Sequence, residues 1–163
     1  MRIVESRAHA TAVAFGPHGV LLRGASGAGK SDLALRLIAR HGPAESQQKW
    51  MLIGDDQVEL SSEADGIVAR APEALRGKLE IRGLGIVDVP SIEQTTVALV
   101  VDLVAREAVE RLPEPDLRVD LLGVKLPYLK LHAFDASAPA KIEFALGIAL
   151  SPSFMGRGCP KGE

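Results

Sequence analysis

The sequence predicts an α/β fold with a phosphate-binding loop and a mixed β-sheet that has few helices. Three observations predict this fold. Residues 24–31, GASGAGKS, match the phosphate-loop pattern of Gly, four residues, Gly, Lys and Ser. An apolar, strand-like run at residues 19–23 precedes the loop, and a mostly apolar helical run follows it and ends near Gly42. Most of the later segments alternate apolar and polar residues as strands do.

The residue types in this loop suit the binding of a polyphosphate. Glycines let consecutive backbone N–H groups point inward at a helix N-terminus, where they hold phosphate oxygens. A lysine then places its charge on the outer phosphates, and a serine hydroxyl binds the accompanying Mg²⁺. The predicted nucleotide-binding residues are Gly24, Ala25, Ser26, Gly27, Ala28, Gly29, Lys30 and Ser31. A short Gly/Ser/Ala turn can match the pattern by chance, but the flanking strand and helix favour the phosphate loop.

Composition indicates one globular domain. The 163 residues are 47% hydrophobic and 25% charged, and we expect a domain at residues 1–150 followed by a flexible tail at residues 151–163. A net charge of −2 and few aromatic residues argue against a nucleic-acid partner. The single cysteine, Cys159, cannot form an internal disulfide, and no run is long enough to span a membrane. We therefore expect a cytoplasmic protein with no membrane partner.

The segments around the loop read as strands. Residues 10–15 and 19–23 form a predicted hairpin through the turn at residues 16–19, so a hairpin leads into the loop. Residues 57–61 and 67–70 alternate like two further strands on either side of a turn.

The second half of the chain supplies the centre of the sheet and a closing helix. Residues 96–104, TVALVVDLV, form the longest β-branched apolar run and predict a central strand. Residues 117–134 alternate like two more strands. Residues 137–150 predict a helix, with Ser137 as its N-cap and Pro139 in its first turn.

Two adjacent acids end the apolar strand predicted at residues 49–56. In phosphate-loop enzymes such a strand commonly ends in an Asp that holds Mg²⁺ or its water shell. Asp55 and Asp56 could divide two tasks, one toward the metal and one toward the nucleophile. The alternative is a solvated turn, in which Asp is common. His9, which precedes the first hairpin, is by position alone typical of a surface or packing residue.

A carboxylate and a guanidinium lie two residues apart at residues 78–90. Glu80 and Arg82 would point to the same face of a strand, and the GLG that follows would form a bend. On the residues alone, a structural ion pair and a functional pair are equally good interpretations.

Four features in order resemble the catalytic domain of HPr kinase/phosphorylase, the bacterial enzyme that phosphorylates a serine of the phosphocarrier HPr. They are His9, GASGAGKSD at residues 24–32, LIGDD at residues 52–56 and LEIRGLGIVDV at residues 79–89. The last is the most diagnostic, and the resemblance covers roughly residues 8–150. The family's separate N-terminal domain has no counterpart here, so we expect a short, catalytic-domain-only member.

The resemblance implies catalytic roles for three residues. Asp55 matches the family's acid/base, which takes the proton from the target serine and returns one in the reverse reaction. His9 matches a histidine that assists this Asp, and Arg82 matches the signature arginine near the active site.

The resemblance also implies the metal site, the cofactors and the partners. Asp56 and Glu80, with Ser31, match metal-associated groups. The implied cofactors are ATP and Mg²⁺, the implied substrate is HPr or an HPr-like phosphocarrier, and the implied assembly is a homohexamer. The implied fold is related to the nucleotide-binding core of phosphoenolpyruvate carboxykinase. Two alternatives stay open: a small-molecule kinase, and a nucleotide-sensing module without turnover.

One segment departs from the family pattern. The family usually carries a flexible loop with Pro-Gly-Arg-Asn after the KLP element, whereas residues 131–141 here read LHAFDASAPAK, without that arginine. Lys125 and Lys130 are the nearest basic residues, and we interpret them as solvated strand residues. The departure bears on phosphate-driven dephosphorylation and on the use of pyrophosphate more than on the kinase reaction.

Overall fold

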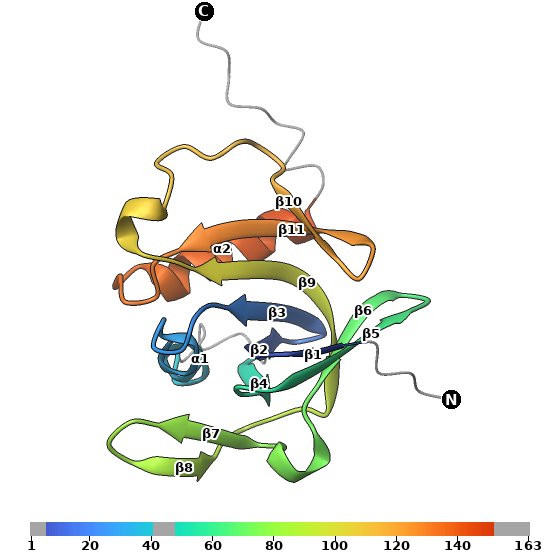
Figure 1. The fold of residues 1–163 in the computed structure, drawn as a ribbon, viewed down its shortest axis with the longest axis vertical. Helices are drawn as coiled ribbons and strands as arrows, with labels where there is room; N and C mark the ends of the chain where they lie inside the picture. The colour runs from blue at the N-terminus through green and yellow to red at the C-terminus, as the bar shows by residue number, and fades with distance from the viewer. Residues whose placement is uncertain (1–5, 41–47, 152–163) are drawn as a thin grey trace, which may run out of the picture.

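The computed structural model describes residues 6–40 and 48–151, which form a nine-stranded mixed sheet, a two-stranded ribbon and two α-helices (Figure 1). The strands are β1 (Ser6–Ala8), β2 (Ala10–Phe15), β3 (His18–Arg23), β4 (Trp50–Gly54), β5 (Val58–Glu63), β6 (Gly66–Arg70), β7 (Lys78–Ile81), β8 (Gly85–Asp88), β9 (Gln94–Leu103), β10 (Arg118–Leu121) and β11 (Val124–Leu131). The helices are α1 (Lys30–Ile38) and α2 (Ala138–Leu150), with short 3-10 helices at Glu73–Leu75 and Arg106–Ala108. The predicted fold class, a mixed sheet with few helices, is confirmed.

Strand β9 is the centre of the sheet. It pairs in parallel with β3 and with β11, and antiparallel with β6. The main path through the sheet runs β1, β5, β6, β9, β3, β2, β4, and β10 joins the sheet through β11. The β-branched run at residues 96–104 therefore forms the central strand that its composition predicts, because such a strand is covered on both faces.

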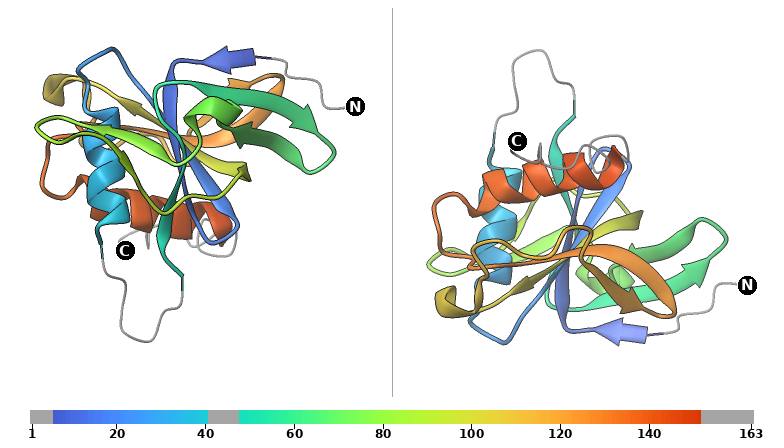
Figure 2. Two further views of the ribbon diagram at one scale, coloured as in Figure 1. Left: turned by 90° about the horizontal axis from the view of Figure 1, so that it is seen from below. Right: turned by 90° about the horizontal axis from the view of Figure 1, so that it is seen from above.

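Both helices cover the same face of the sheet (Figure 2). Leu33 and Leu37 of α1 pack with Ile142 and Leu146 of α2 over Leu22 of β3. These side chains are almost completely buried. Burial of each stabilises the fold by roughly 1.5–3 kcal/mol, and it holds α1 against the strand that leads into the loop.

A second core lies on the opposite face. It joins Leu21 of β3 and Ile53 of β4 to Leu60 of β5 and Ile67 of β6. Because no helix covers this face in the described residues, the sheet itself curls, and β5 and β6 bend across it (Figure 1).

The strand directions bring the predicted functional residues to one edge. Strand β2 is antiparallel to both β3 and β4, so the C-terminal ends of β3 and β4 lie on either side of the N-terminal end of β2. The register confirms this arrangement, since Ala10 pairs with Arg23 and Ala12 pairs with Gly54. The phosphate-loop motif, the two acids after β4 and the residues at the start of β2 therefore meet.

Three local features differ from the prediction or fall outside the description. Helix α1 ends at Ile38 rather than near Gly42, since the chain tightens there and the Arg40 N–H donates to Leu37 O, three residues back; the Arg40 side chain pairs with Glu143 of α2. Ser137 stands at the N-cap position of α2, but its side chain makes no capping hydrogen bond. Gly42 and, apart from Ser151, the predicted tail lie outside the described residues.

Candidate active site

The loop between β3 and α1 depends on two glycines with positive φ. Gly27 has a φ of 83° and Gly29 a φ of 97°, which side-chain-bearing residues rarely adopt. Lys30 begins α1 and is only 7% exposed. Its Nζ donates hydrogen bonds to the carbonyl oxygens of Gly24 at 2.7 Å and Ala25 at 3.1 Å. The ammonium group is therefore held at the loop, beside the backbone that would receive a phosphate.

Asp55 accepts more hydrogen bonds than the other acids of the site. The residue is 8% exposed, and its carboxylate accepts three hydrogen bonds. The hydroxyls of Thr11 and Ser31 both donate to Oδ1, at 2.9 Å and 2.7 Å, and the backbone N–H of Glu80 donates to Oδ2 at 3.2 Å. Three chain segments therefore converge on one carboxylate, which links α1 to β2, β4 and β7.

Asp56 has the opposite environment. It has a φ of 64° and its side chain is 63% exposed toward the cleft. His9, itself 56% exposed, places Nδ1 at 3.0 Å from Asp56 Oδ1. The resemblance implied that His9 assists Asp55, but the structure pairs it with Asp56, because Asp55 turns inward toward Thr11 and Ser31.

Glu80 and Arg82 lie on the β7–β8 ribbon, though not as predicted. Glu80 is in β7, whereas Arg82 follows the end of that strand and lies in the turn, since the chain reverses there toward β8. In the described part of the chain no ion pair joins the two side chains. Both residues nevertheless line the cleft, and the backbone of Glu80 contacts Asp55. Arg82 does not share a strand face with Glu80 as predicted, although it does reach the site.

A cleft of about 530 Å³ opens between the loop, the end of β4 and the ribbon. Its lining includes ten of the residues predicted from the sequence: His9, Ser26, Gly27, Gly29, Lys30, Ser31, Asp55, Asp56, Glu80 and Arg82. Gly24, Ala25 and Ala28 belong to the same loop but do not line the cleft. The sequence-predicted set is therefore brought together in space, with every catalytic and metal candidate at the cleft.

Sequence reasoning missed residues on two segments. Thr11 lies behind Asp55, and its position as the one polar residue in the apolar run ATAVAF of β2 could have indicated it. Phe134 lines the cleft from the segment after β11, and no sequence pattern marked it. Lys125 and Lys130 are exposed on β11 and do not line the cleft, which agrees with their interpretation as solvated strand residues.

The donor set fits Mg²⁺. This ion prefers oxygen ligands and usually keeps several waters while it binds one or two carboxylates and substrate phosphates. The Ser31 hydroxyl and the Asp55 carboxylate supply such oxygens beside the loop, with Asp56 and Glu80 at the same cleft. Within residues 6–40 and 48–151, no three acidic, His or Cys side chains cluster as a ready metal site. Phosphate oxygens and water would complete the coordination.

A second polar network holds the strand that leads into the loop. Arg23, immediately before Gly24, donates two hydrogen bonds to Asp102 of β9, at 2.7 Å and 3.0 Å, and Tyr128 of β11 donates a third at 2.7 Å. The Asp102 hydrogen bond raises the pKa of Arg23. Burial, followed by the same carboxylate, raises the pKa of Tyr128 to about 12. The last residue of β3 is therefore fixed to the two strands beside it.

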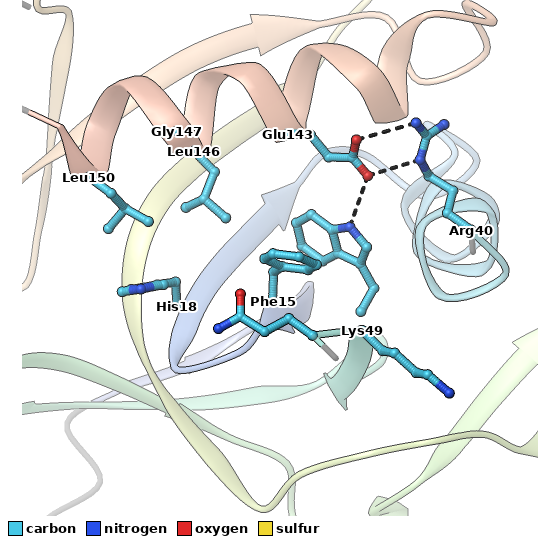
Figure 3. A pocket seen from close by; sticks show the side chains of 10 residues that line it. Phe15, His18, Arg40, Lys49, Glu143, Leu146, Gly147 and Leu150 are labelled. Atoms are coloured by element: carbon cyan, nitrogen blue, oxygen red, sulfur yellow. Dashed lines mark hydrogen bonds and ion pairs between the residues drawn. The ribbon is translucent and has the colours of Figure 1, made fainter. Parts of the chain in front are cut away.

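Another cavity, of about 370 Å³, lies away from these groups, between β2, β4 and α2 (Figure 3). Its lining includes the rings of Phe15 and Trp50, whose centroids lie 5.3 Å apart, and Leu146 and Leu150 of α2. It contains none of the residues predicted to act in catalysis. No helix in the described residues is long and apolar enough to cross a membrane.

The chain is similar to known proteins over most of its length. Residues 3–146 match the HPr Serine kinase C-terminal domain. The HPr kinase/phosphorylase of Bordetella pertussis is 42% identical over 126 residues, which are 70% of this chain and 38% of that protein. The HPr kinase/phosphorylase of Caldicellulosiruptor bescii is 36% identical over 132 residues, 74% of this chain and 40% of that protein. This chain thus matches about two fifths of the length of these curated relatives.

A solved structure shares the fold. The HPr(Ser) kinase/phosphatase of Coxiella burnetii superposes with a TM-score of 0.73 at 27% sequence identity, covering 88% of this chain and 89% of that one. The match to the HPr Serine kinase C-terminal domain, at residues 3–146, extends from β1 into α2 and includes the loop, both acids and the ribbon. On this evidence the chain belongs to the HPr serine kinase C-terminal domain family.

Proposed function

We propose that this chain transfers the γ-phosphoryl group of ATP to a serine hydroxyl of HPr or an HPr-like protein, in a reaction that requires Mg²⁺. The observation that carries the proposal is the convergence of Ser31, Asp55 and Asp56 on one cleft beside Lys30. A loop that cradles phosphates, hydroxyl and carboxylate oxygens for Mg²⁺, and an open carboxylate are the parts that phosphoryl transfer to an alcohol needs. Relatives that carry the name HPr kinase/phosphorylase support the choice of substrate.

Nucleotide binding in this proposal depends on the loop and its lysine. The backbone N–H groups of residues 24–31 would hold the phosphates, and Lys30 would exchange its bonds to Gly24 and Ala25 for bonds to phosphate oxygens. Ser31 would contribute its hydroxyl to Mg²⁺, with Asp55 behind it. The bound metal would neutralise charge that develops on the transferred group.

The two acids divide their roles differently from the assignment that the resemblance implied. A serine on a protein substrate must reach the base, and the Asp55 carboxylate is nearly buried with three hydrogen bonds from the protein. The Asp56 side chain is exposed to the cleft, and its Oδ1 lies 3.0 Å from His9 Nδ1. We therefore propose that Asp56 accepts the proton, with His9 as its orienting partner. Asp55 would hold the Ser31 hydroxyl in place and contribute to Mg²⁺ binding.

The chemical step moves one proton and exchanges two bonds at phosphorus. The serine oxygen forms a bond to the γ-phosphorus while the bond to the β,γ-bridging oxygen breaks, and ADP leaves with that oxygen. Asp56 accepts the hydroxyl proton. The protein contributes mainly position and charge, since little covalent chemistry is required of it. Arg82, at the same cleft, would supply positive charge toward the substrate.

The test is transfer of labelled γ-phosphate from ATP to purified HPr with Mg²⁺, using matched Asp→Asn variants. Asp56→Asn should lose transfer by a factor of about 10² or more and keep Mg²⁺-dependent ATP binding, because the base is lost and the phosphate site is not. Asp55→Asn should weaken the Mg²⁺-dependent part of ATP binding. The opposite result, with Asp56→Asn active and Asp55→Asn inert but still binding Mg·ATP, would return the base role to Asp55.

Other outcomes separate the remaining alternatives. ATP that binds tightly while nothing is phosphorylated would indicate a nucleotide-sensing module, and turnover of a metabolite with inert HPr would indicate a small-molecule kinase. Addition of excess inorganic phosphate to serine-phosphorylated HPr tests the reverse reaction. Loss of the label would show that dephosphorylation does not need the arginine that residues 131–141 lack.

The assembly and location are also proposals. Family membership supports a homohexamer acting in the cytoplasm, with no nucleic acid or membrane as partner. Light scattering on the purified chain measures the oligomeric state directly. A monomer that phosphorylates HPr would separate the catalytic proposal from the proposed assembly.

A further inference from the structure

A buried threonine hydroxyl contacts the acid that holds the metal-binding serine. Thr11 is in β2, within the apolar sequence ATAVAF, and is 0% exposed. Its Oγ1 donates a 2.9 Å hydrogen bond to Asp55 Oδ1. A hydroxyl buried among apolar side chains is unfavourable unless it has a partner, and the partner here is a carboxylate 44 residues away in sequence.

The position of Thr11 excludes a direct role toward the nucleotide. Thr11 does not line the cleft, whereas Ser31 and Asp55 do. The two hydroxyls of Thr11 and Ser31 approach the same oxygen, Oδ1, from β2 and from α1 respectively. Thr11 therefore acts on the carboxylate from the inner side, while Ser31 contacts it from the side of the phosphate loop.

We propose that Thr11 is a positioning residue that fixes the Asp55 carboxylate in the orientation that holds Ser31 for Mg²⁺. The inference rests on the proposed function, since it concerns the metal side of that site. With Glu80 N–H on Oδ2, both carboxylate oxygens are tied, so the carboxylate cannot rotate without losing a hydrogen bond. Loss of the Thr11 hydroxyl leaves each carboxylate oxygen with a single hydrogen bond, from Ser31 to Oδ1 and from the Glu80 N–H to Oδ2, so the orientation of the carboxylate is less firmly fixed.

The side-chain type suits this task. A β-branched threonine has restricted χ1 freedom, so its hydroxyl direction is set by the strand. Valine has nearly the same shape without the hydroxyl, and serine has the hydroxyl without the methyl group. Mutation of a residue that orients a metal ligand through a hydrogen bond typically lowers metal affinity 10- to 100-fold. The three residues at position 11 therefore form a series in which only the hydroxyl and its stiffness vary.

The experiment measures ATP binding as a function of Mg²⁺ concentration, with a fluorescent ATP analogue as the probe. Thr11→Val should raise the half-saturating Mg²⁺ concentration about tenfold and leave nucleotide binding without Mg²⁺ unchanged. Thr11→Ser should restore most of the Mg²⁺ response. In HPr phosphorylation, Thr11→Val should lower kcat and leave the KM for HPr unchanged, because the substrate surface is not touched.

Thr95→Val is the matched control. Thr95 is also buried, but its hydroxyl donates to backbone carbonyl oxygens of Pro17 and Thr96, away from Asp55. The Thr95→Val variant removes a buried hydroxyl that makes no hydrogen bond to a residue of the cleft, so the Mg²⁺ response should stay unchanged. If Thr11→Val fails to fold, Thr11→Ala, which matches its neighbours Ala10 and Ala12, replaces it with the same expected result.

The outcomes distinguish this inference from the proposed function. A folded Thr11 variant with the wild-type Mg²⁺ response, or a wild type whose ATP binding ignores Mg²⁺, overturns the role of Thr11. A wild type that binds Mg·ATP but leaves HPr unphosphorylated overturns the proposed function alone, because the Mg²⁺ response of the Thr11 variants can still be measured.

Discussion

The Ser31 hydroxyl donates a 2.7 Å hydrogen bond to Oδ1 of Asp55 and so joins the first turn of α1 to the end of β4. Residues 24 positions apart in the sequence thereby form one oxygen-rich corner of the cleft. Ser31→Ala should raise the Mg²⁺ concentration needed for half-maximal ATP binding by about tenfold, since one hydrogen bond to a charged group is lost. Titration of nucleotide binding with Mg²⁺ measures this change.

Two variants check the origin of that effect. Ser31→Thr keeps the hydroxyl and should respond to Mg²⁺ nearly as the wild type does. Ser62→Ala, at an exposed position of β5, should change nothing. An equal loss in Ser31→Ala and Ser31→Thr would contradict a role for the hydroxyl and indicate a packing defect.

Gly29 should tolerate alanine less well than Gly27 does. Both residues have positive φ, so alanine at either costs about 1–2 kcal/mol in backbone strain. A Cβ at Gly29 would also lie 2.7 Å from the Cβ of Ala133, whereas a Cβ at Gly27 would meet nothing within 4 Å. Gly29→Ala should therefore lose a further ~1–3 kcal/mol of unfolding free energy, as overpacked sites do. Urea unfolding measures both variants, and equal losses would show that the contact with Ala133 relaxes freely.

Glu143 should matter more to stability than the arginine that pairs with it. Glu143 accepts hydrogen bonds from Arg40 and, at 3.1 Å, from the indole N–H of Trp50, which is 3% exposed (Figure 3). Glu143→Ala leaves a buried donor without its partner and should cost about 1–3 kcal/mol. Arg40→Ala removes only an exposed ion pair and should cost about 0.2–1 kcal/mol. Trp50 is the single tryptophan, so its fluorescence reports unfolding of both variants.

Tyr128 should make stability depend on pH above pH 10. Burial and the hydrogen bond to Asp102 raise its pKa in the folded state from 10.0 to about 12. A pKa raised by folding favours the folded state while the phenol is protonated in it, so this contribution is complete below pH 10 and is lost as pH rises through about 12. The stability difference between the wild type and Tyr128→Phe should narrow across this interval. Urea unfolding at several pH values tests it, and a constant difference would contradict the assignment.

Much of the fold followed from local pattern. The apolar run at residues 96–104 predicted the central strand, and the alternation at residues 117–134 predicted two strands, which the structure pairs as β10 and β11. Side-chain periodicity carries this information because a strand buried on both faces and a strand buried on one face have different residue patterns. The predicted end of α1 was too late by about four residues, because the last turn tightens at Arg40, whose N–H donates to Leu37 O, and no residue type marks that point before Gly42.

The sequence pattern also identified most residues of the candidate site. The spacing of residues 24–31 identified the loop, and the position of Asp55 and Asp56 at the end of an apolar strand identified the two acids. It did not separate the two acids, since adjacent identical residues have the same local signature. Arg82 was misplaced on a strand, because nothing in the run at residues 79–89 marked where β7 ends and the turn begins.

The sequence by itself determined the fold class, the phosphate-loop motif and the family, because each depends on residue types at fixed spacing. Only the tertiary structure decided the different environments of the two acids. The antiparallel placement of β2 between β3 and β4 sets Thr11 and Ser31 against Asp55 and sets His9 against Asp56. Burial and hydrogen bonding then make one carboxylate fixed and the other open, and both arise from contacts between segments that are distant in the chain.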